Sequence, residues 1–330
     1  AYQKAMEQDP GRDDTLAAVR SLAQKPQVAA SALDLLEEYY RGAGDLEEVV
    51  RLYQKRVELT PADADRVALL TEAASIWEND IGRPEEALAA MRDAVRTDPR
   101  DRSLLDSLER LADVSGRWAD LDGLVDEIAA QGDLARRELY ELRLRSARWY
   151  RDHLSNMSRA ERALTEALQL DPEPLEAHAQ RVTLIRAQGR TADLVSGLRA
   201  WADVEPDADQ RIALLREAAE LAHQELAQSE LAADCYQELI AIDRNDVGAL
   251  RALCDIRRSQ SRWNEVVGLL ERQLEVVAGD ERTPVAQAVG QVYRDHLNDP
   301  RAAIRAYEAA LELDENDPVT MNALEALYQD

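Results

Sequence analysis

The stretch RVALLTEAASIWENDIGRPEEALAAMRDAVRTDP (residues 66–99) decides the fold of this 330-residue chain. Its apolar residues recur at helical spacing on both sides of a short break, which predicts two antiparallel helices. The helical pattern over residues 66–97 closes on Asp98-Pro99, and a proline after the last turn cannot continue a helix. The same arrangement, which we name the regular hairpin, recurs over residues 138–170, 211–242 and 285–313.

Two sets of small residues keep one period along the chain. Four residues in the breaks between helices are separated by 72, 73 and 72 positions: Gly44, Gly116, Gly189 and Ser261. Four alanines are separated by 73, 72 and 71 positions: Ala87, Ala160, Ala232 and Ala303. Repetition of this kind is typical of solenoids, which lack one closed core. We therefore predict an all-α fold, an α-solenoid.

Each module is predicted to contain one regular hairpin and one looser hairpin. The looser hairpins cover about residues 33–59, 104–130, 175–203 and 248–277. A single solenoid domain over residues 1–330 would then consist of modules at about 33–101, 102–173, 174–245 and 246–317, with an extra helical segment at 13–30 broken at Pro26. The chain is expected to begin and stop within a module, because two end segments match half hairpins: Tyr2, Ala5, Asp9 and Pro10, and residues 319–328.

The regular hairpins resemble the tetratricopeptide repeat. In that family a small residue of the first helix meets an alanine of the second, followed by a large residue, a second alanine and a proline. Three hairpins carry the pattern: Ala74, Ala87, Met91, Ala94 and Pro99; Ala147, Ala160, Leu164, Ala167 and Pro172; and Gly290, Ala303, Tyr307 and Ala310. The hairpin at 211–242 departs from it with Leu239 and Arg244. The looser hairpins depart further, with four large residues at the alanine position: Val49, Leu121, Leu194 and Val266. The resemblance implies a right-handed superhelix in which first helices line a concave groove.

The charge of the chain limits its partners. Lys and Arg total 40 against 65 Asp and Glu, a net charge of −25, whereas nucleic-acid and anionic-membrane binders need a basic footprint. We therefore do not expect the chain to bind nucleic acid. We also expect no direct membrane insertion, because no stretch reaches the roughly 18–20 apolar residues of a membrane-spanning helix. The scarcity of lysine and the abundance of alanine and arginine suggest a GC-rich bacterial genome. Cys235 and Cys254 are expected to be buried reduced thiols, which favours a cytoplasmic location.

The residues that invite a catalytic interpretation have simpler structural ones. His153 and His296 belong to the pentapeptide YRDHL, which occurs at 150–154 and 293–297, at a helix end where a cation suits the dipole. Asp63 and Asp207 precede helices and are expected to complement free backbone amides there. No phosphate-binding loop, nucleophile elbow or metal-binding histidine pair occurs. We expect a non-enzyme without a cofactor or a metal.

The tryptophans can likewise be interpreted either as packing residues or as residues on which a ligand stacks. Trp118 and Trp263 occupy equivalent positions in two modules, which favours packing over ligand stacking. Trp149 does not repeat and leaves both interpretations open. One further helix breaks the apolar pattern at His178, which either faces the groove or is turned away because the helix is rotated.

Six arginines are concentrated in one part of this acidic chain, which we name the basic island: Arg136, Arg137, Arg143, Arg145, Arg148 and Arg151. They either bind a carboxylate, a phosphate or an acidic peptide through bidentate contacts, or form ion pairs within and between helices. The resemblance places seven candidates for partner binding at or near groove positions: Arg148, Arg151, Arg216, Glu220, His223, Gln291 and Arg294.

Two functions follow. The first is a non-catalytic protein–protein interaction scaffold that binds a peptide segment or helix of a partner along the concave groove. The alternative is a structural spacer or self-associating array without a specific groove ligand. The lysine and asparagine clamp by which some family members hold the carboxyl tail of chaperones is not expected, because the groove candidates include no lysine.

Overall fold

The computed structural model describes residues 13–25 and 27–329. Within them lie 18 α-helices and no strand, which confirms the predicted all-α class. The first helices of successive pairs are α3 (Ala29–Ala43), α5 (Asp63–Ser75), α7 (Arg102–Ser115), α9 (Arg136–Arg148), α11 (Leu175–Ala187), α13 (Ala208–Gln224), α15 (Val247–Ser259), α17 (Arg282–Asp295) and α19 (Pro318–Gln329). The second helices are α4 (Leu46–Leu59), α6 (Pro84–Thr97), α8 (Leu124–Gln131), α10 (Met157–Leu170), α12 (Thr191–Val204), α14 (Ser229–Ile242), α16 (Trp263–Val276) and α18 (Pro300–Leu313).

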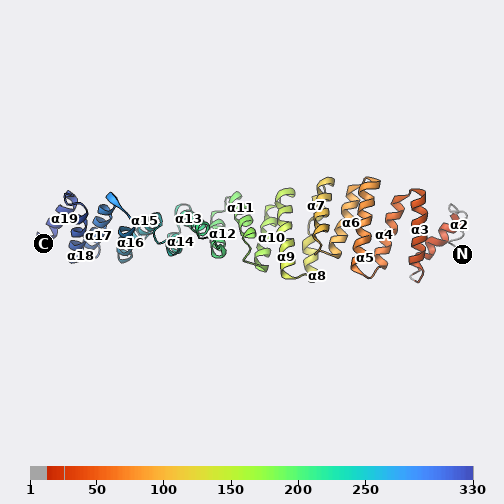
Figure 1. The fold of residues 1–330 in the computed structure, drawn as a ribbon, viewed down its shortest axis with the longest axis horizontal. Coiled ribbons are helices and arrows are strands. Elements are labelled where there is room, and N and C mark those ends of the chain that lie inside the picture. Colours follow the sequence, from red (N-terminus) through yellow and green to blue (C-terminus); the bar gives the residue numbers. More distant parts are fainter. Residues whose placement is uncertain (1–12, 26, 330) are drawn as a thin grey trace. The chain divides into compact units, whose positions relative to one another are not determined.

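The helices form two compact units, Ala1–Ala163 and Leu164–Asp330, which we name the N-terminal and C-terminal units. In each unit a helix packs mainly against its neighbours in sequence, so the helix pairs follow one another as an α-solenoid (Figure 1). Helix α2 (Asp13–Leu22) packs against α3. The predicted break at Pro26 and the half hairpin at Tyr2, Ala5, Asp9 and Pro10 lie outside the described residues.

The turns explain why small residues keep the period. The four residues of the first set all have positive φ: Gly44 (73°), Gly116 (66°), Gly189 (67°) and Ser261 (57°). The turns inside the regular hairpins have the same property: Gly82 (77°), Ser155 (49°), Ala227 (54°) and Asn298 (52°). Glycine adopts this left-handed conformation without steric cost, whereas other residues are strained in it. The backbone of the turn therefore selects the residue at these positions.

Aspartates start several helices by capping them. Asp207 Oδ1 accepts a hydrogen bond from the backbone N–H of Gln210 at 2.8 Å, and Asp246 Oδ1 accepts one from Ala249 at 2.9 Å. Each bond satisfies a backbone donor that the helix itself leaves free. Asp63 instead lies inside the first turn of α5, where it forms an ion pair with Arg66.

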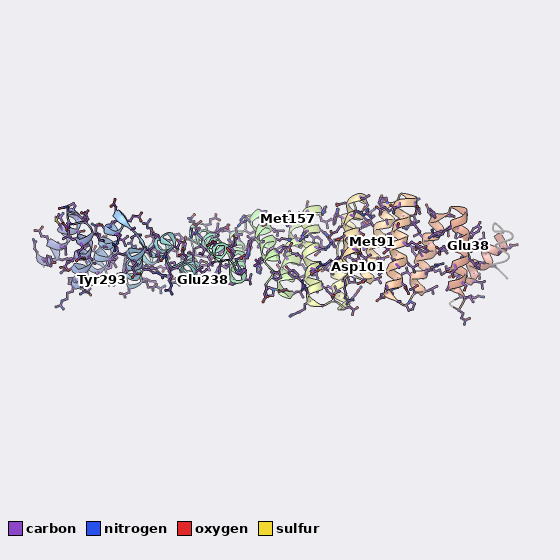
Figure 2. All side chains as sticks on the ribbon, viewed as in Figure 1. Glu38, Met91, Asp101, Met157, Glu238 and Tyr293 are labelled. Atoms are coloured by element: carbon purple, nitrogen blue, oxygen red, sulfur yellow. The ribbon has the colours of Figure 1, made fainter. Side chains whose placement is uncertain are left out.

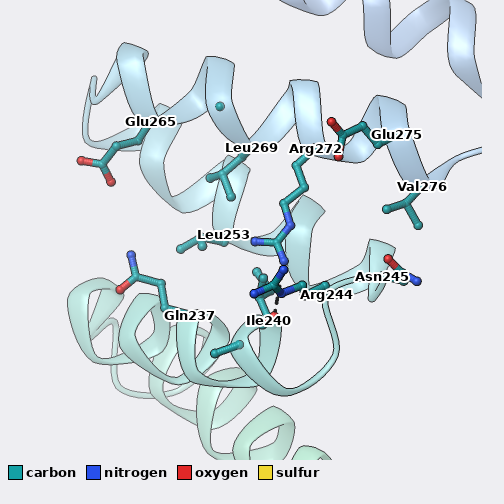
Figure 3. A pocket seen from close by; sticks show the side chains of 12 residues that line it. Gln237, Ile240, Arg244, Asn245, Leu253, Glu265, Leu269, Arg272, Glu275 and Val276 are labelled. Atoms are coloured by element: carbon teal, nitrogen blue, oxygen red, sulfur yellow. Dashed lines mark hydrogen bonds between the residues drawn. The ribbon is translucent and has the colours of Figure 1, made fainter.

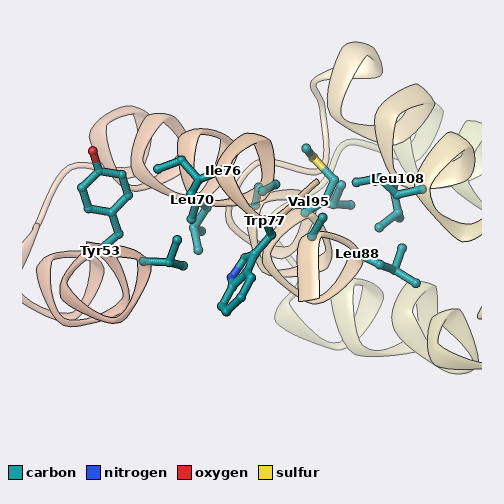
Figure 4. Packing of buried hydrophobic residues seen from close by; sticks show 14 of the residues in the cluster. Tyr53, Leu70, Ile76, Trp77, Leu88, Val95 and Leu108 are labelled. Atoms are coloured by element: carbon teal, nitrogen blue, oxygen red, sulfur yellow. The ribbon is translucent and has the colours of Figure 1, made fainter. Parts of the chain in front are cut away.

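The core runs from helix to helix within each unit. In the N-terminal unit Tyr53 of α4, Leu70 of α5, Leu88 of α6 and Leu108 of α7 belong to one cluster of buried side chains (Figure 4). The alanines expected at close helix contacts are buried, with Ala87 and Ala94 fully inaccessible. Met91, labelled in Figure 2, is the large residue between them and is 5% exposed. Stability therefore depends on contacts between neighbours rather than on a single centre.

The second helix of the hairpin at 104–130 differs from the prediction. It consists of a 3₁₀ turn, η2 (Trp118–Leu121), and the short helix α8, separated by Gly123 with φ of 79°. Tyr150 holds this break, because its hydroxyl donates to Asp122 Oδ1 at 3.1 Å and accepts from the Gly123 N–H at 3.4 Å. The local sequence predicts one continuous helix here, and a contact with the next helix pair divides it into two.

Candidate functional site

Successive first helices of the N-terminal unit are joined by ion pairs. Arg41 of α3 lies 2.8 Å from Glu72 of α5, and Arg145 of α9 lies 2.7 Å from Asp106 of α7. Arg110 of α7 reaches back to Glu78, in the π-helical turn η1 (Ile76–Ile81) that follows α5. The exposed sides of these helices therefore form a continuous surface, which we name the first-helix face of the unit.

Tyr53 strengthens the first of these contacts. Its hydroxyl lies 2.8 Å from both Glu37 and Glu72 and accepts a hydrogen bond from Arg41 at 2.7 Å. Burial and the two carboxylates raise the pKa of Tyr53 above its ordinary value, because ionisation would place a third negative charge in the cluster. The tyrosine thus remains a neutral donor that links α3, α4 and α5.

The C-terminal unit has the same kind of first-helix face, formed by α11, α13, α15, α17 and α19. Arg186 of α11 lies 2.8 Å from Glu217 of α13. Arg251 of α15 lies 2.8 Å from Glu281, which belongs to the 3₁₀ turn η4 (Gly279–Glu281) before α17. Arg216 of α13 forms an ion pair with Asp246, the residue that caps α15. Most charges at these helix contacts are therefore compensated within the chain.

The basic island is largely paired. Arg143 forms an ion pair with Asp126, Arg145 with Asp106 and Glu109, and Arg137 with Glu141 at 3.7 Å. These contacts match the ion-pair interpretation at three positions. Trp149, in the π-helical turn η3 (Trp149–His153), is 4% exposed, and its indole N–H donates to Glu109 at 2.8 Å. Its ring therefore packs in the core of the N-terminal unit.

Two of the seven predicted site residues belong to the N-terminal unit. Arg148 is exposed at the end of α9. Arg151 lies in η3, where its guanidinium donates to both carboxylate oxygens of Asp152 at 2.7 and 2.9 Å. These hydrogen bonds lower the pKa of Asp152. A partner that binds Arg151 would have to compete with this intramolecular contact.

The other five lie on two helices of the C-terminal unit. Arg216, Glu220 and His223 follow one side of α13 at helical spacing and are exposed. Gln291 and Arg294 are exposed on α17, where the Arg294 guanidinium donates to Asp295 at 2.6 Å. Glu220 and His223 form no hydrogen bond or ion pair with any other described residue. They are therefore accessible on the first-helix face without an internal contact to break.

The repeated histidines pack on the repeated tryptophans. Trp118 stacks on His153 with a centroid separation of 3.7 Å, and Trp263 stacks on His296 with a separation of 3.5 Å. The two stacks occupy equivalent places in two modules and join the second helix of one pair to the end of the next first helix. Their repetition was visible in the sequence, but their mutual contact was not.

Hollows of the surface lie elsewhere. In the N-terminal unit one of about 610 Å³ lies between α3 and α5 and is lined by Asp34, Asp65 and Glu72. In the C-terminal unit one of about 760 Å³ lies between the second helices α14 and α16 and is lined by Arg244 and Arg272 (Figure 3). Neither hollow is lined by any of the seven predicted residues. Arg244, which lines the second hollow, was noted in the sequence only as a replacement of the proline of the repeat.

The described residues give no sign of other chemistry. No group of three His, Cys, Asp or Glu side chains among them is arranged to hold a metal ion. Cys235 and Cys254 are free and buried, as predicted, and burial raises the pKa of the Cys235 thiol to about 11. None of the helices in the described part is long and apolar enough to cross a membrane.

Comparisons with known proteins agree with this architecture. Two family models described as tetratricopeptide repeat match residues 32–67 and 284–317. A comparison with curated proteins found no match.

Solved structures similar to the chain include a tetratricopeptide repeat protein from Parabacteroides merdae, with 14% identity and a TM-score of 0.32, over 79% of this chain and 98% of that one. Another is YrrB, described as a TPR protein with an unusual peptide-binding site, with 14% identity and a TM-score of 0.30, over 56% of this chain and 90% of that one. A third is the P58(IPK) TPR domain, with 16% identity and a TM-score of 0.25, over 99% of this chain and 95% of that one. The two repeat matches show that the chain contains tetratricopeptide repeats, in agreement with its helix pairs.

Proposed function

We propose that this chain is a non-catalytic scaffold that binds a segment or helix of a partner protein along its first-helix faces. Tetratricopeptide repeat proteins generally mediate protein–protein interactions, and the family is generally non-catalytic. The open question for such a chain is which of its exposed side chains are available to a partner.

The proposal rests on the exposure of Glu220 and His223 and on their lack of hydrogen bonds and ion pairs with other described residues. Both are exposed on α13 at positions that the family resemblance assigns to the groove, and neither is bonded to another described residue. A partner can therefore form hydrogen bonds with them without losing internal ones, which keeps the free energy of binding favourable. Arg216, one turn earlier, is already paired with Asp246 and contributes less.

We propose that the remaining candidates contribute less to the affinity for a partner. Arg151 and Arg294 each bond to the next residue in the chain, Asp152 and Asp295, and such exposed pairs contribute little to stability. A partner carboxylate can replace the intramolecular one at small cost. Together with Arg148 and Gln291 they would give charge steering and specificity, while a few anchors supply most of the affinity.

The spacer alternative has its own support. Ion pairs between neighbouring first helices satisfy many polar groups of each face without any partner, as in Arg186 with Glu217 and Arg251 with Glu281. Such contacts suit an array that only sets distance or self-associates. The two functions differ in whether a change on the exposed face alters the capture of a partner.

A pull-down with charge-reversed variants tests the proposal. The immobilised chain, the Glu220→Arg/His223→Glu variant and an Asp203→Arg control would be exposed to native cell lysate, and the retained proteins would be compared by mass spectrometry. Asp203 is exposed on the second helix α12, outside the first-helix face. We expect a partner retained by the parent and by Asp203→Arg but lost from the α13 variant. Equal retention by all three, or retention by none, would favour the spacer.

A further inference from the structure

The hollow between α14 and α16 combines two positive charges with an apolar floor. Arg244 enters it from the turn after α14 and Arg272 from α16, and Figure 3 shows their guanidinium groups pointing toward the same place. Aliphatic side chains complete the lining: Ile240, Leu253, Leu269 and Val276. At about 760 Å³ it has room for several amino-acid side chains.

Neither guanidinium is neutralised. The contact given for Arg272 is a long hydrogen bond of 3.5 Å to the carbonyl oxygen of Ile240. Arg244 forms no hydrogen bond or ion pair with any other residue in the described part of the chain. Two like charges directed at one place repel each other, and an anion bound between them would remove that cost. An acidic chain of net charge −25 offers many carboxylates, yet none of those described forms an ion pair with Arg244 or Arg272.

The acidic residues at the rim are engaged elsewhere or directed outward. Glu265 lies 3.0 Å from Arg257 and 2.7 Å from Arg262, so its carboxylate is already shared by two arginines. Glu275 is exposed and forms no ion pair among the described residues. The carboxylates that line the hollow therefore leave the two guanidinium groups available.

The charge of this hollow is not inherited from the repeat. Arg244 stands where the two preceding regular hairpins have Pro99 and Pro172. Arg272 is the ninth residue after Trp263, and the ninth residues after the equivalent Leu46, Trp118 and Thr191 are Lys55, Glu127 and Ala200. Position 272 is thus not fixed by the repeat, although Lys55 gives the first module a cation there, and position 244 departs from the proline of the two preceding regular hairpins. The combination of an arginine at both positions is particular to this hollow.

We propose that this hollow is a second binding site, for an acidic segment of a partner protein. A carboxylate of the segment accepts hydrogen bonds from Arg244 and Arg272, and a neighbouring aliphatic side chain packs on Leu269 and Val276, which are partly exposed. The planar guanidinium matches a carboxylate in a bidentate geometry. The partly exposed side chains of Leu269 and Val276 favour a peptide over a free inorganic anion, which would leave them in contact with water. The site lies between second helices and is independent of the function assigned to the first-helix faces.

A random-peptide display library tests the site directly. The library would be selected on the whole chain, and enriched peptides, labelled with fluorescein, would be titrated by fluorescence polarisation. We expect enrichment of Asp or Glu beside Leu, Ile or Val. Affinity of the enriched peptide should fall about tenfold or more in Arg244→Gln/Arg272→Gln, and similarly when the peptide acid becomes its amide.

Controls separate the site from general charge effects and from unfolding. Arg282→Gln/Arg301→Gln carries the same change of charge on exposed arginines of α17 and α18 and should bind the peptide as the parent does. Circular dichroism melting should show both variants folded. The proposal is overturned if no acidic peptide is enriched, or if the Arg244/Arg272 variant binds equally well. Displacement of the peptide by millimolar inorganic phosphate but not by acetate would also overturn it, in favour of a phosphate site.

Discussion

Gly290 of α17 packs so closely against Tyr307 of α18 that a β-carbon at position 290 would lie 2.9 Å from three carbon atoms of the ring. The equivalent pairs in the other regular hairpins are Ala74 with Met91, Ala147 with Leu164 and Ala219 with Tyr236. Tyr236 opposite Ala219 shows that a tyrosine does not by itself require glycine, so it is the placement of the Tyr307 ring that leaves no room for a β-carbon at position 290.

Gly290→Ala should destabilise the chain although alanine is the better helix former. The gain in helix propensity is about 1 kcal/mol, whereas overpacking a tight contact costs about 1–3 kcal/mol. We expect a net loss of about 1 kcal/mol in urea denaturation. In a Tyr307→Leu background the clash is gone, so Gly290→Ala should become stabilising. A loss of similar size in both backgrounds would show that the ring does not exclude the β-carbon.

Glycine should stabilise two strained turns. Ala227 and Ser261 have φ values of 54° and 57°. The other three positions equivalent to Ser261 hold glycine, and one equivalent of Ala227, Gly82, does so. Relief of the left-handed strain is worth about 1–2 kcal/mol, and the greater freedom of unfolded glycine offsets about half of it. We expect Ala227→Gly and Ser261→Gly each to raise the free energy of unfolding by about 0.5–1 kcal/mol. Gly116→Ala is the reverse control and should lower it, although no atom obstructs a β-carbon there.

Removal of two carboxylates should harm the fold more than removal of the arginine they surround. Arg257 is 3% exposed and lies 3.0 Å from both Glu230 and Glu265, which are themselves partly exposed. Glu230→Ala/Glu265→Ala leaves a buried charge unpaired and should cost about 2 kcal/mol, while Arg257→Met leaves only solvated carboxylates and should cost about 1 kcal/mol. Urea midpoints of the two variants give the order. Arg258→Met, on the exposed side of α15, should change stability by less than about 0.5 kcal/mol.

The buried thiols should make stability depend on pH in the alkaline range. An unfolded cysteine has a pKa of about 8.5, whereas burial raises the pKa of Cys235 to about 11. Between these values the unfolded state loses its proton first, so stability should fall as pH rises from about 8.5 to 11, with no such contribution below this range. At pH 8 the folded thiol should react with iodoacetamide about a hundredfold more slowly than in urea. A flat stability curve over this range, unchanged in Cys235→Ala, would contradict the assignment.

Much of the fold was predictable because the residues that end helices and form turns recur at the period of the repeat. The second helices of the regular hairpins end at Thr97, Leu170, Ile242 and Leu313, directly before the aspartates identified in the sequence. The period of Gly44 and its equivalents reflects one backbone conformation, which a sequence can encode through glycine alone.

Features that depend on contacts between modules were not predictable. The break at Gly123 is held by Tyr150, 27 residues away. His178 is 6% exposed, with Nε2 2.8 Å from the carbonyl oxygen of Pro172. The simple rotation of its helix is therefore wrong in part, because Val182 and Ile185 are buried together with the histidine. A polar residue is buried here because a backbone acceptor lies within reach, and sequence spacing does not report that acceptor.

The candidate site shows the same limit. The family resemblance predicts that Glu220 and His223 are groove positions, but only the structure separates them from Arg216, which is paired. Arg257 and the hollow at Arg244 and Arg272 depend on three helices meeting, and spacing within one helix does not reveal such a meeting.

The most direct test of the scaffold function is site-specific photo-crosslinking on the whole chain. A benzophenone amino acid would replace His223 on the first-helix face of α13 or, as the control, exposed Ser196 on the second helix α12. After irradiation in native cell lysate, we expect a discrete protein adduct from position 223 that Glu220→Arg abolishes, and none from position 196. Equal adducts from both positions, or no adduct from position 223, would contradict partner binding on the first-helix face.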